Sequence, residues 1–237
     1  MSEAAAPAPC PLGVCDGSGF VVDEDARVAV PCSCRPQQVE RRRARSLSAV
    51  IPRKYRGVSF DRPPVTQISP PIVAAVRRYV DQINERLEVG DGLWLQGDVG
   101  TGKTTLAMLA SRSALDAGRS VAIYSLPRLL SEIRATYDAD SEGSYVDFLD
   151  RLARVDLLHL DDLGAERSSP WVLEQLYAII NARYEDERAV LITTNLSLEH
   201  LTEQITDRTV SRLKEMCEVL PLHGSDVRAG LRSVQRA

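Results

Sequence analysis

One run of eight residues has the spacing of a loop that binds phosphate. It reads Gly97-Asp98-Val99-Gly100-Thr101-Gly102-Lys103-Thr104, and Thr105 follows directly. Glycines let the backbone turn tightly so that its N–H groups face phosphate oxygens, and the N-terminus of a following helix adds positive potential. Lys103 is placed to reach the β- and γ-phosphates, and the Thr104 hydroxyl to ligate magnesium. Because an apolar strand pattern precedes the run and a helical pattern follows it, residues 97–105 predict a site for ATP and magnesium.

Polar side chains that suit hydrolysis follow two other strand patterns. Asp161 and Asp162 end the apolar run 155–160, and Asn195 ends the run 189–193. We expect Asp161, on a strand that neighbours the phosphate loop, to hold magnesium through water, and Asp162 to orient or deprotonate the attacking water. Asn195 is placed to hydrogen-bond the γ-phosphate or that water. Each of these groups also occurs in ordinary turns at strand ends, so the prediction depends on their pairing with the phosphate loop.

Four of the five cysteines lie within the first 34 residues. Cys10 and Cys15 are separated by four residues, Cys32 and Cys34 by one, and sixteen residues lie between the pairs. Four thiolates suit a closed tetrahedral zinc site, and a segment this short has too little core to fold without a metal. Unrelated thiols are the alternative. Cys217 stands apart and is expected in the core.

Strand and helix patterns alternate from about residue 71 onward, which predicts an α/β fold. The five expected strands are 93–96, 121–124, 155–160, 189–193 and 218–222. The expected helices are 72–87, 103–117, 126–137, 145–153, 171–184, 198–205 and 209–214. Such alternation favours a mostly parallel, five-stranded sheet with helices on both faces. We expect three parts: a cysteine-rich module at 1–35, a basic helix and linker at 36–70, and a nucleotide-binding domain at 71–237.

Composition narrows the setting. The net charge of −4 does not suit a chain that is a basic nucleic-acid binder throughout, and no apolar run is long enough to span a membrane. The N-terminus lacks the pattern of a signal peptide, so we expect a cytoplasmic protein with no membrane contact. Residues 35–57 nevertheless hold eight basic residues and one acidic residue. This segment is either a solvated helix and linker or a surface for phosphates or an acidic partner.

Taken together, these features resemble the AAA+ ATPases, and among them the DnaC/DnaI helicase loaders and the related IstB transposition ATPases. The residues that carry the resemblance are 51–56, 97–104, 160–166, 193–195 and 207–213. The resemblance implies a P-loop fold of the AAA+ type, ATP hydrolysis, and assembly into a homo-oligomer when ATP is bound. The cysteine module resembles the N-terminal zinc module of DnaI-type loaders, which contacts the replicative helicase.

The resemblance also implies roles for single residues. Asn195 matches sensor 1, Arg228 matches sensor 2, and Arg212 matches the arginine finger that completes a neighbour's active site. Arg208 is the nearby alternative for the finger. Asp162 stands where many AAA+ enzymes have glutamate.

Three functions fit these observations. The first is a loader that uses ATP to assemble a hexameric replicative helicase on single-stranded DNA. The second is an IstB-like transposition helper ATPase, although proteins of that type generally lack the cysteine module. The third is an adaptor whose ATP site is only structural, which the intact Lys103, Asp161 and Arg212 argue against. The cysteine module and the basic segment favour the loader.

Overall fold

The cysteine module contains an antiparallel pair of strands. The computed structural model describes residues 10, 12–23, 28–35, 50–137, 145–164, 169–224 and 226. In the module, β1 (Phe20–Asp23) pairs with β2 (Val28–Pro31), with Val21 opposite Val30. β2 is exposed throughout, and in β1 Phe20 and Val21 are only half-buried, so the described part of the module has little apolar core of its own.

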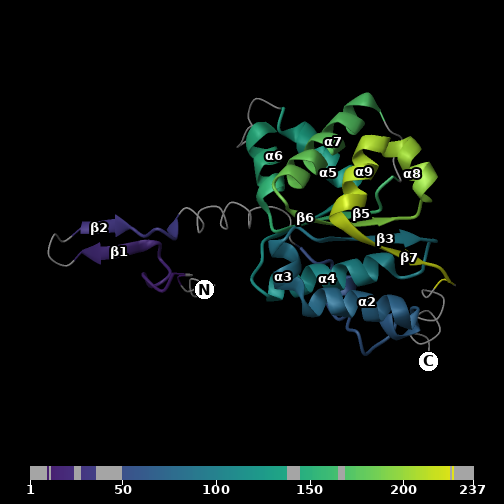
Figure 1. The fold of residues 1–237 in the computed structure, drawn as a ribbon, viewed down its shortest axis with the longest axis horizontal. Coiled ribbons are helices and arrows are strands. Elements are labelled where there is room, and N and C mark those ends of the chain that lie inside the picture. The colour runs from purple at the N-terminus through teal and green to yellow at the C-terminus, as the bar shows by residue number, and fades with distance from the viewer. Residues whose placement is uncertain are drawn as a thin grey trace.

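A five-stranded parallel sheet forms the centre of the rest of the chain (Figure 1). Its strands are β3 (Gly92–Gly97), β4 (Val121–Ser125), β5 (Leu157–Asp161), β6 (Ala189–Thr194) and β7 (Cys217–Leu222). Their order across the sheet is β4-β5-β6-β3-β7. The expected sheet is therefore confirmed. One detail was wrong: β5, which ends in Asp161, does not neighbour β3, because β6 pairs with both strands and lies between them.

Helices cover both faces of the sheet (Figure 1). One face carries α2 (Pro70–Asp81), α3 (Ile83–Glu88) and α4 (Lys103–Asp116). The other carries α5 (Leu126–Ala135), α6 (Tyr145–Arg154), α7 (Pro170–Glu185), α8 (Leu198–Ile205) and α9 (Asp207–Met216). None of the helices in the described ranges is long and apolar enough to span a membrane.

Alternation along each strand divides the core in two, because successive side chains point to opposite faces of a sheet. Leu93, Leu95 and Leu191 pack with α2, α3 and α4, whereas Trp94 and Ile192 pack with α5 to α9. All five side chains are fully buried. Burial on both faces explains why these strands read as continuous apolar runs in the sequence.

The helix expected over 72–87 is two helices. Gln82 leaves the helical region, with φ −101° and ψ 19°, and separates α2 from α3. Tyr79 before the break and Leu87 after it are both buried in the same core cluster. The apolar periodicity therefore continues through the break, which is why the sequence does not mark it.

The connector before α2 packs against the sheet domain. It includes two short 3₁₀ helices, η1 (Arg53–Tyr55) and η2 (Val65–Gln67). Ile51, Val58, Val65 and Ile68 are buried in the same core cluster as α2 and α4. The guanidinium of Arg112 in α4 also donates to backbone carbonyls of this connector, at distances of 2.7 and 2.6 Å. We therefore propose that the ATPase domain begins near residue 50 instead of 71.

Candidate nucleotide-binding and hydrolysis site

The phosphate loop joins the end of β3 to the start of α4, as its spacing predicted. Gly102 caps α4 with φ 96°, a left-handed conformation that favours glycine. Lys103 is the first residue of the helix, and its Nζ donates to the carbonyls of Gly97 and Asp98, both at 2.7 Å. The Thr101 hydroxyl donates to the same Asp98 carbonyl at 2.9 Å. These contacts hold the loop in a tight turn at the positive end of α4.

Gly97 and Gly100 both leave little room for a side chain: a Cβ at Gly97, whose φ is 146°, would lie 1.9 Å from the Leu222 carbonyl oxygen, and Gly100 faces Asp226. The φ of Gly100 is 89°, and a Cβ added to Gly100 would lie 2.2 Å from Cγ of Asp226. Asp226, the last described residue, thus lies against the phosphate loop. Arg228, expected to act as sensor 2, lies outside the described residues.

Asp161 is joined to the phosphate loop by hydroxyl groups. The Thr104 hydroxyl donates to Oδ1 of Asp161 at 2.9 Å, and the Thr193 hydroxyl donates to the same oxygen at 2.8 Å. Thr193 belongs to β6, so it fills the gap that the strand order leaves between β3 and β5. A carboxylate and a hydroxyl this close offer the oxygen ligands that magnesium prefers.

The surroundings of Asp161 favour its charged form. Burial raises the pKa of this carboxyl, but nearby His159 and the hydroxyls of Thr193 and Thr104 lower it, and the resulting pKa lies below the ordinary value. His159 is fully buried, as expected of a core histidine, and its Nδ1 lies 2.9 Å from the Ser111 hydroxyl. Asp161 is therefore a carboxylate at neutral pH, which is the form that binds a cation.

Asp162 and Asn195 meet at the carboxyl ends of their strands. The Asn195 amide donates to Oδ1 of Asp162 at 2.6 Å. Asp162 has φ 61°, uncommon for a residue other than glycine, and its backbone N–H donates to the Thr193 hydroxyl at 2.8 Å. These two bonds hold the carboxylate in one orientation at the edge of the site.

A cavity of about 440 Å³ brings these residues together. Most of the phosphate loop lines it, as do Asp161, Asp162, Thr193 and Asn195. Its remaining walls come from the connector: Lys54, Tyr55, Val58 and Pro64. Thr193 and Tyr55 line the cavity but were not among the predicted site residues. The resemblance of residues 51–56 and 193–195 to the loaders was the signal that pointed to both segments.

Arg212 and Arg208 lie on α9 and are absent from the described lining of this cavity. Arg208 is exposed, in the first turn of the helix. Arg212 is partly buried against α7, where its guanidinium lies over the rings of Tyr177 and Tyr184. Neither arginine is placed to contact a nucleotide in the cavity of its own chain.

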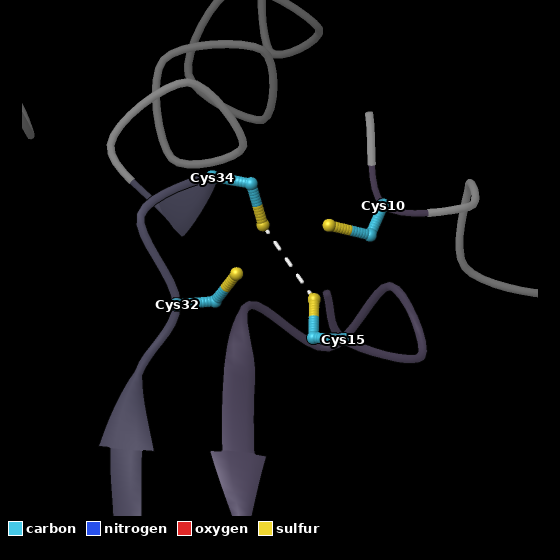
Figure 2. Close-up of side chains that lie close together, drawn as sticks. All are labelled: Cys10, Cys15, Cys32 and Cys34. Carbon is cyan, nitrogen blue, oxygen red and sulfur yellow. Dashed lines mark hydrogen bonds between the residues drawn. The ribbon is translucent and has the colours of Figure 1, made fainter. Parts of the chain in front are cut away.

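The four N-terminal cysteines form a cluster (Figure 2). Their side chains point toward one another, and all four Sγ atoms lie within 4.8 Å of one another. Tetrahedral zinc with Zn–S bonds of about 2.3 Å requires sulfur atoms about 3.8 Å apart, so the cluster fits a metal ion. The Cys15 backbone N–H lowers the pKa of Cys10 to about 6, whereas burial and the neighbouring thiols raise that of Cys34. A metal ion among the sulfur atoms would offset the raised pKa of Cys34.

Comparison with known families shows which family the chain belongs to. The model of the family described as IstB-like ATP binding protein matches residues 80–235, which is more than half of the chain. The chain belongs to this family. The expected relation to IstB ATPases is thereby confirmed.

The chain is also similar in sequence to individual proteins of this kind. The replicative helicase loader DnaC of Escherichia coli K12 is 26% identical over 142 residues, which are 60% of this chain and 56% of that protein. The DnaC proteins of Buchnera aphidicola are 24–25% identical over 143 residues. The chain thus spans only a little more than half the length of these curated relatives.

Solved structures show the same fold. A crystal structure of the DnaC helicase loader has a TM-score of 0.63 and 28% identity, and the match covers 73% of this chain and all of that chain. DnaI matches with a TM-score of 0.55 and 21% identity, over 79% of this chain and 93% of that chain, which shows the fold alone. The expected resemblance to the DnaC/DnaI loaders is confirmed at this level.

Proposed function

We propose that this protein is an ATPase that hydrolyses ATP at the cavity between the phosphate loop and the ends of β5 and β6. The observation that carries the proposal is the linkage of Thr104, Asp161, Thr193, Asp162 and Asn195 by four hydrogen bonds of 2.6–2.9 Å. These bonds join Thr104 of the phosphate loop to the side chain of Asp161 and, through Thr193, to Asp162.

Each side chain has one task in this proposal. The loop N–H groups and Lys103 bind the phosphates, and Thr104 and Asp161 would hold magnesium, which neutralises charge on the phosphate oxygens. Asp162 accepts the proton of the attacking water, in the orientation that Asn195 maintains. Tyr55 and Val58 offer an apolar wall against which a purine base can pack. Arg212 contacts the γ-phosphate bound by an adjoining subunit, and Arg228 would contact the nucleotide of its own chain.

We further propose that the ATPase is a replicative helicase loader. Two observations support this: the similarity to DnaC, and a cysteine cluster at the N-terminus that fits zinc. The alternative is a transposition helper ATPase, which the IstB-like family match favours. In either case we expect the protein to form a homo-oligomer with ATP.

Single-stranded DNA is the proposed nucleic-acid partner. Tyr137, which follows α5, stacks on Tyr145 at the start of α6, with ring centroids 5.3 Å apart and planes at 25°. Tyr137 is 54% exposed. An exposed ring is a surface on which an unpaired base can stack, contributing about 1–3 kcal/mol. Tyr137, stacked on the half-buried Tyr145, is therefore the ring proposed for this contact.

A retention assay distinguishes the candidates. Immobilised protein with ATP and magnesium is exposed to the replicative helicase of the same organism, and separately to an IS21-type transposase with duplex DNA. A loader retains the helicase, and Cys32→Ser, which breaks the cysteine cluster, abolishes this retention without loss of ATP binding. Retention of the transposase alone would support the transposition helper. Retention of neither, with no ATP hydrolysis, would contradict both.

The DNA contact has its own test. Tyr137→Ala should weaken binding of a fluorescent oligonucleotide about 10-fold, whereas Tyr137→Phe, which keeps the ring, should bind like the parent. Equal affinity for all three proteins would exclude this stacking surface.

A further inference from the structure

Arg212 is held between two aromatic rings on the neighbouring helix. Its Cζ lies 5.0 Å from the ring centroid of Tyr177 and 5.4 Å from that of Tyr184. The two tyrosines are seven residues apart on α7, so they share the face of that helix that packs against α9. A guanidinium within about 6 Å of a ring centroid is attracted to the ring face, so the two rings restrict where this side chain points.

The carboxylate of Glu215 does not form an ion pair with Arg212. Glu215 is three residues further along α9, which is a spacing suited to an ion pair with Arg212. Its carboxylate instead accepts hydrogen bonds from the Tyr184 hydroxyl at 2.7 Å and the Ser211 hydroxyl at 3.4 Å. Within the described part of the chain, no ion pair links Arg212 to a carboxylate, and its buried Nε has no hydrogen-bond partner.

Tyr184 therefore acts on Arg212 in two ways. Its ring packs against the guanidinium, and its hydroxyl occupies the carboxylate that would otherwise pair with it. An arginine held in this manner keeps its charge and its forked donors for an anion from outside the chain. Arg212 does not line the cavity of its own chain, so among the described residues no anion meets it, and one offered by another molecule fits this arrangement.

We propose that Tyr177 and Tyr184 are positioning residues for the arginine finger: they orient Arg212 toward the γ-phosphate of ATP bound by an adjoining subunit. This inference rests on the proposed function of Arg212 in trans. Displacing a catalytic group by about 1 Å can lower a rate about 100-fold, so loss of both rings should lower hydrolysis by about 10- to 100-fold.

Mixed subunits test the proposal directly. Arg212→Ala keeps its own carboxylates and lacks a finger, so it serves as the acceptor. Asp162→Asn keeps the finger and cannot hydrolyse, so it serves as the donor, and their mixture should regain ATPase activity. A second donor combines Asp162→Asn with Tyr177→Leu and Tyr184→Leu. With the same acceptor, this donor should restore 10- to 100-fold less activity at saturating ATP.

Conservative variants separate positioning from folding. A donor with both tyrosines replaced by phenylalanine keeps the rings but releases Glu215, so it should restore an intermediate activity. Adding Glu215→Gln should return that donor to the level of Asp162→Asn alone, because no acid then competes for Arg212. Melting temperature, co-assembly by size-exclusion chromatography and affinity for a fluorescent ATP analogue are measured for every donor.

The outcomes distinguish the two proposals. If the mixture of Asp162→Asn and Arg212→Ala stays inactive although the subunits co-assemble, Arg212 does not act in trans, and both proposals fail. If that mixture is active and the leucine donor restores equal activity, only the positioning role fails. If the leucine donor no longer co-assembles, the rings serve assembly instead, which also overturns the positioning role.

Discussion

Thr193 is the residue whose replacement most directly tests how the site is organised. Its hydroxyl donates to Oδ1 of Asp161 and accepts from the backbone N–H of Asp162, both at 2.8 Å. The side chain is only 1% exposed. Thr193→Val keeps the volume and the β-branched shape, so strand β6 and its packing are retained and only the hydroxyl is removed.

The loss of stability in Thr193→Val follows from the two hydrogen bonds that the substitution removes. The neutral bond to the Asp162 N–H contributes about 1 kcal/mol, and the bond to a carboxylate about 1.5–3 kcal/mol. The Asp161 side chain is 22% exposed, so water replaces part of the second bond. We therefore expect a loss of about 2 kcal/mol in the free energy of unfolding, which lowers the melting temperature by about 4–8 °C for a domain of this size.

The pH dependence of this loss has a defined sign. The pKa of Asp161 is lowered in the folded protein, so the stability that its charge contributes is present above the ordinary pKa of aspartate and is lost as pH falls through the folded value. The difference in melting temperature between parent and Thr193→Val should therefore be largest near pH 7. It should shrink below about pH 4.

Thr193→Val should also change the magnesium dependence of ATP hydrolysis. Replacing a group that orients a metal ligand typically lowers metal affinity about 10- to 100-fold. The Thr193→Val variant should therefore need correspondingly more magnesium for half-maximal ATPase activity. Thr193→Ser retains the hydroxyl and is the matched control. If the valine variant shows the magnesium dependence and the melting temperature of the parent, the hydroxyl does not organise the two carboxylates, and the reasoning is refuted.

Four further changes probe other parts of the molecule. Lys103→Ala removes the charge that faces the phosphates and should weaken binding of a fluorescent ATP analogue about 10- to 100-fold; unchanged affinity would refute the phosphate-loop assignment. Tyr55→Ala should weaken the same binding about fivefold, whereas Tyr55→Phe should not. Cys32→Ser should reduce the zinc measured by elemental analysis from about one ion per chain to almost none, with ATP binding retained; a zinc-free parent would contradict this. Arg183 is fully buried and donates to five backbone carbonyls. Arg183→Met should therefore lower the free energy of unfolding, measured by chemical denaturation, by about 3 kcal/mol. A loss smaller than that caused by Arg183→Lys would contradict this.

The phosphate loop and the strands could be predicted from the sequence because their signals are local. Glycines, lysine and threonine in one run define the loop, and continuous apolar runs define strands that are buried on both faces. All five expected strands are present within about two residues of their predicted ends. The pairing of Asp162 with Asn195 could also be anticipated, because the carboxyl ends of parallel strands meet at one edge of the sheet.

The remainder of the site depends on contacts between distant parts of the chain. The order of strands is set by how helices cover the sheet, and nothing in the run that ends at Asp161 indicates that β6 lies next to it. Thr193 gains its role only from that order. Tyr55 enters the cavity because the connector packs on α4 through Arg112, a contact between residues more than fifty positions apart. Such contacts have no periodicity that sequence analysis could detect.

The position of β6 also relates the candidate site of one subunit to Arg212, the arginine finger proposed to serve the next subunit. Thr193 contacts Asp161 and Asp162 from this strand, and Asn195 at its end holds Asp162. The chain then continues through α8 into α9, where Arg212 lies against α7. The groups proposed to face the γ-phosphate within a subunit and the arginine proposed to serve its neighbour are therefore consecutive parts of one packed segment. A shift at the end of β6 has a short route to Arg212, because α9 packs directly on β6 as well as on α7.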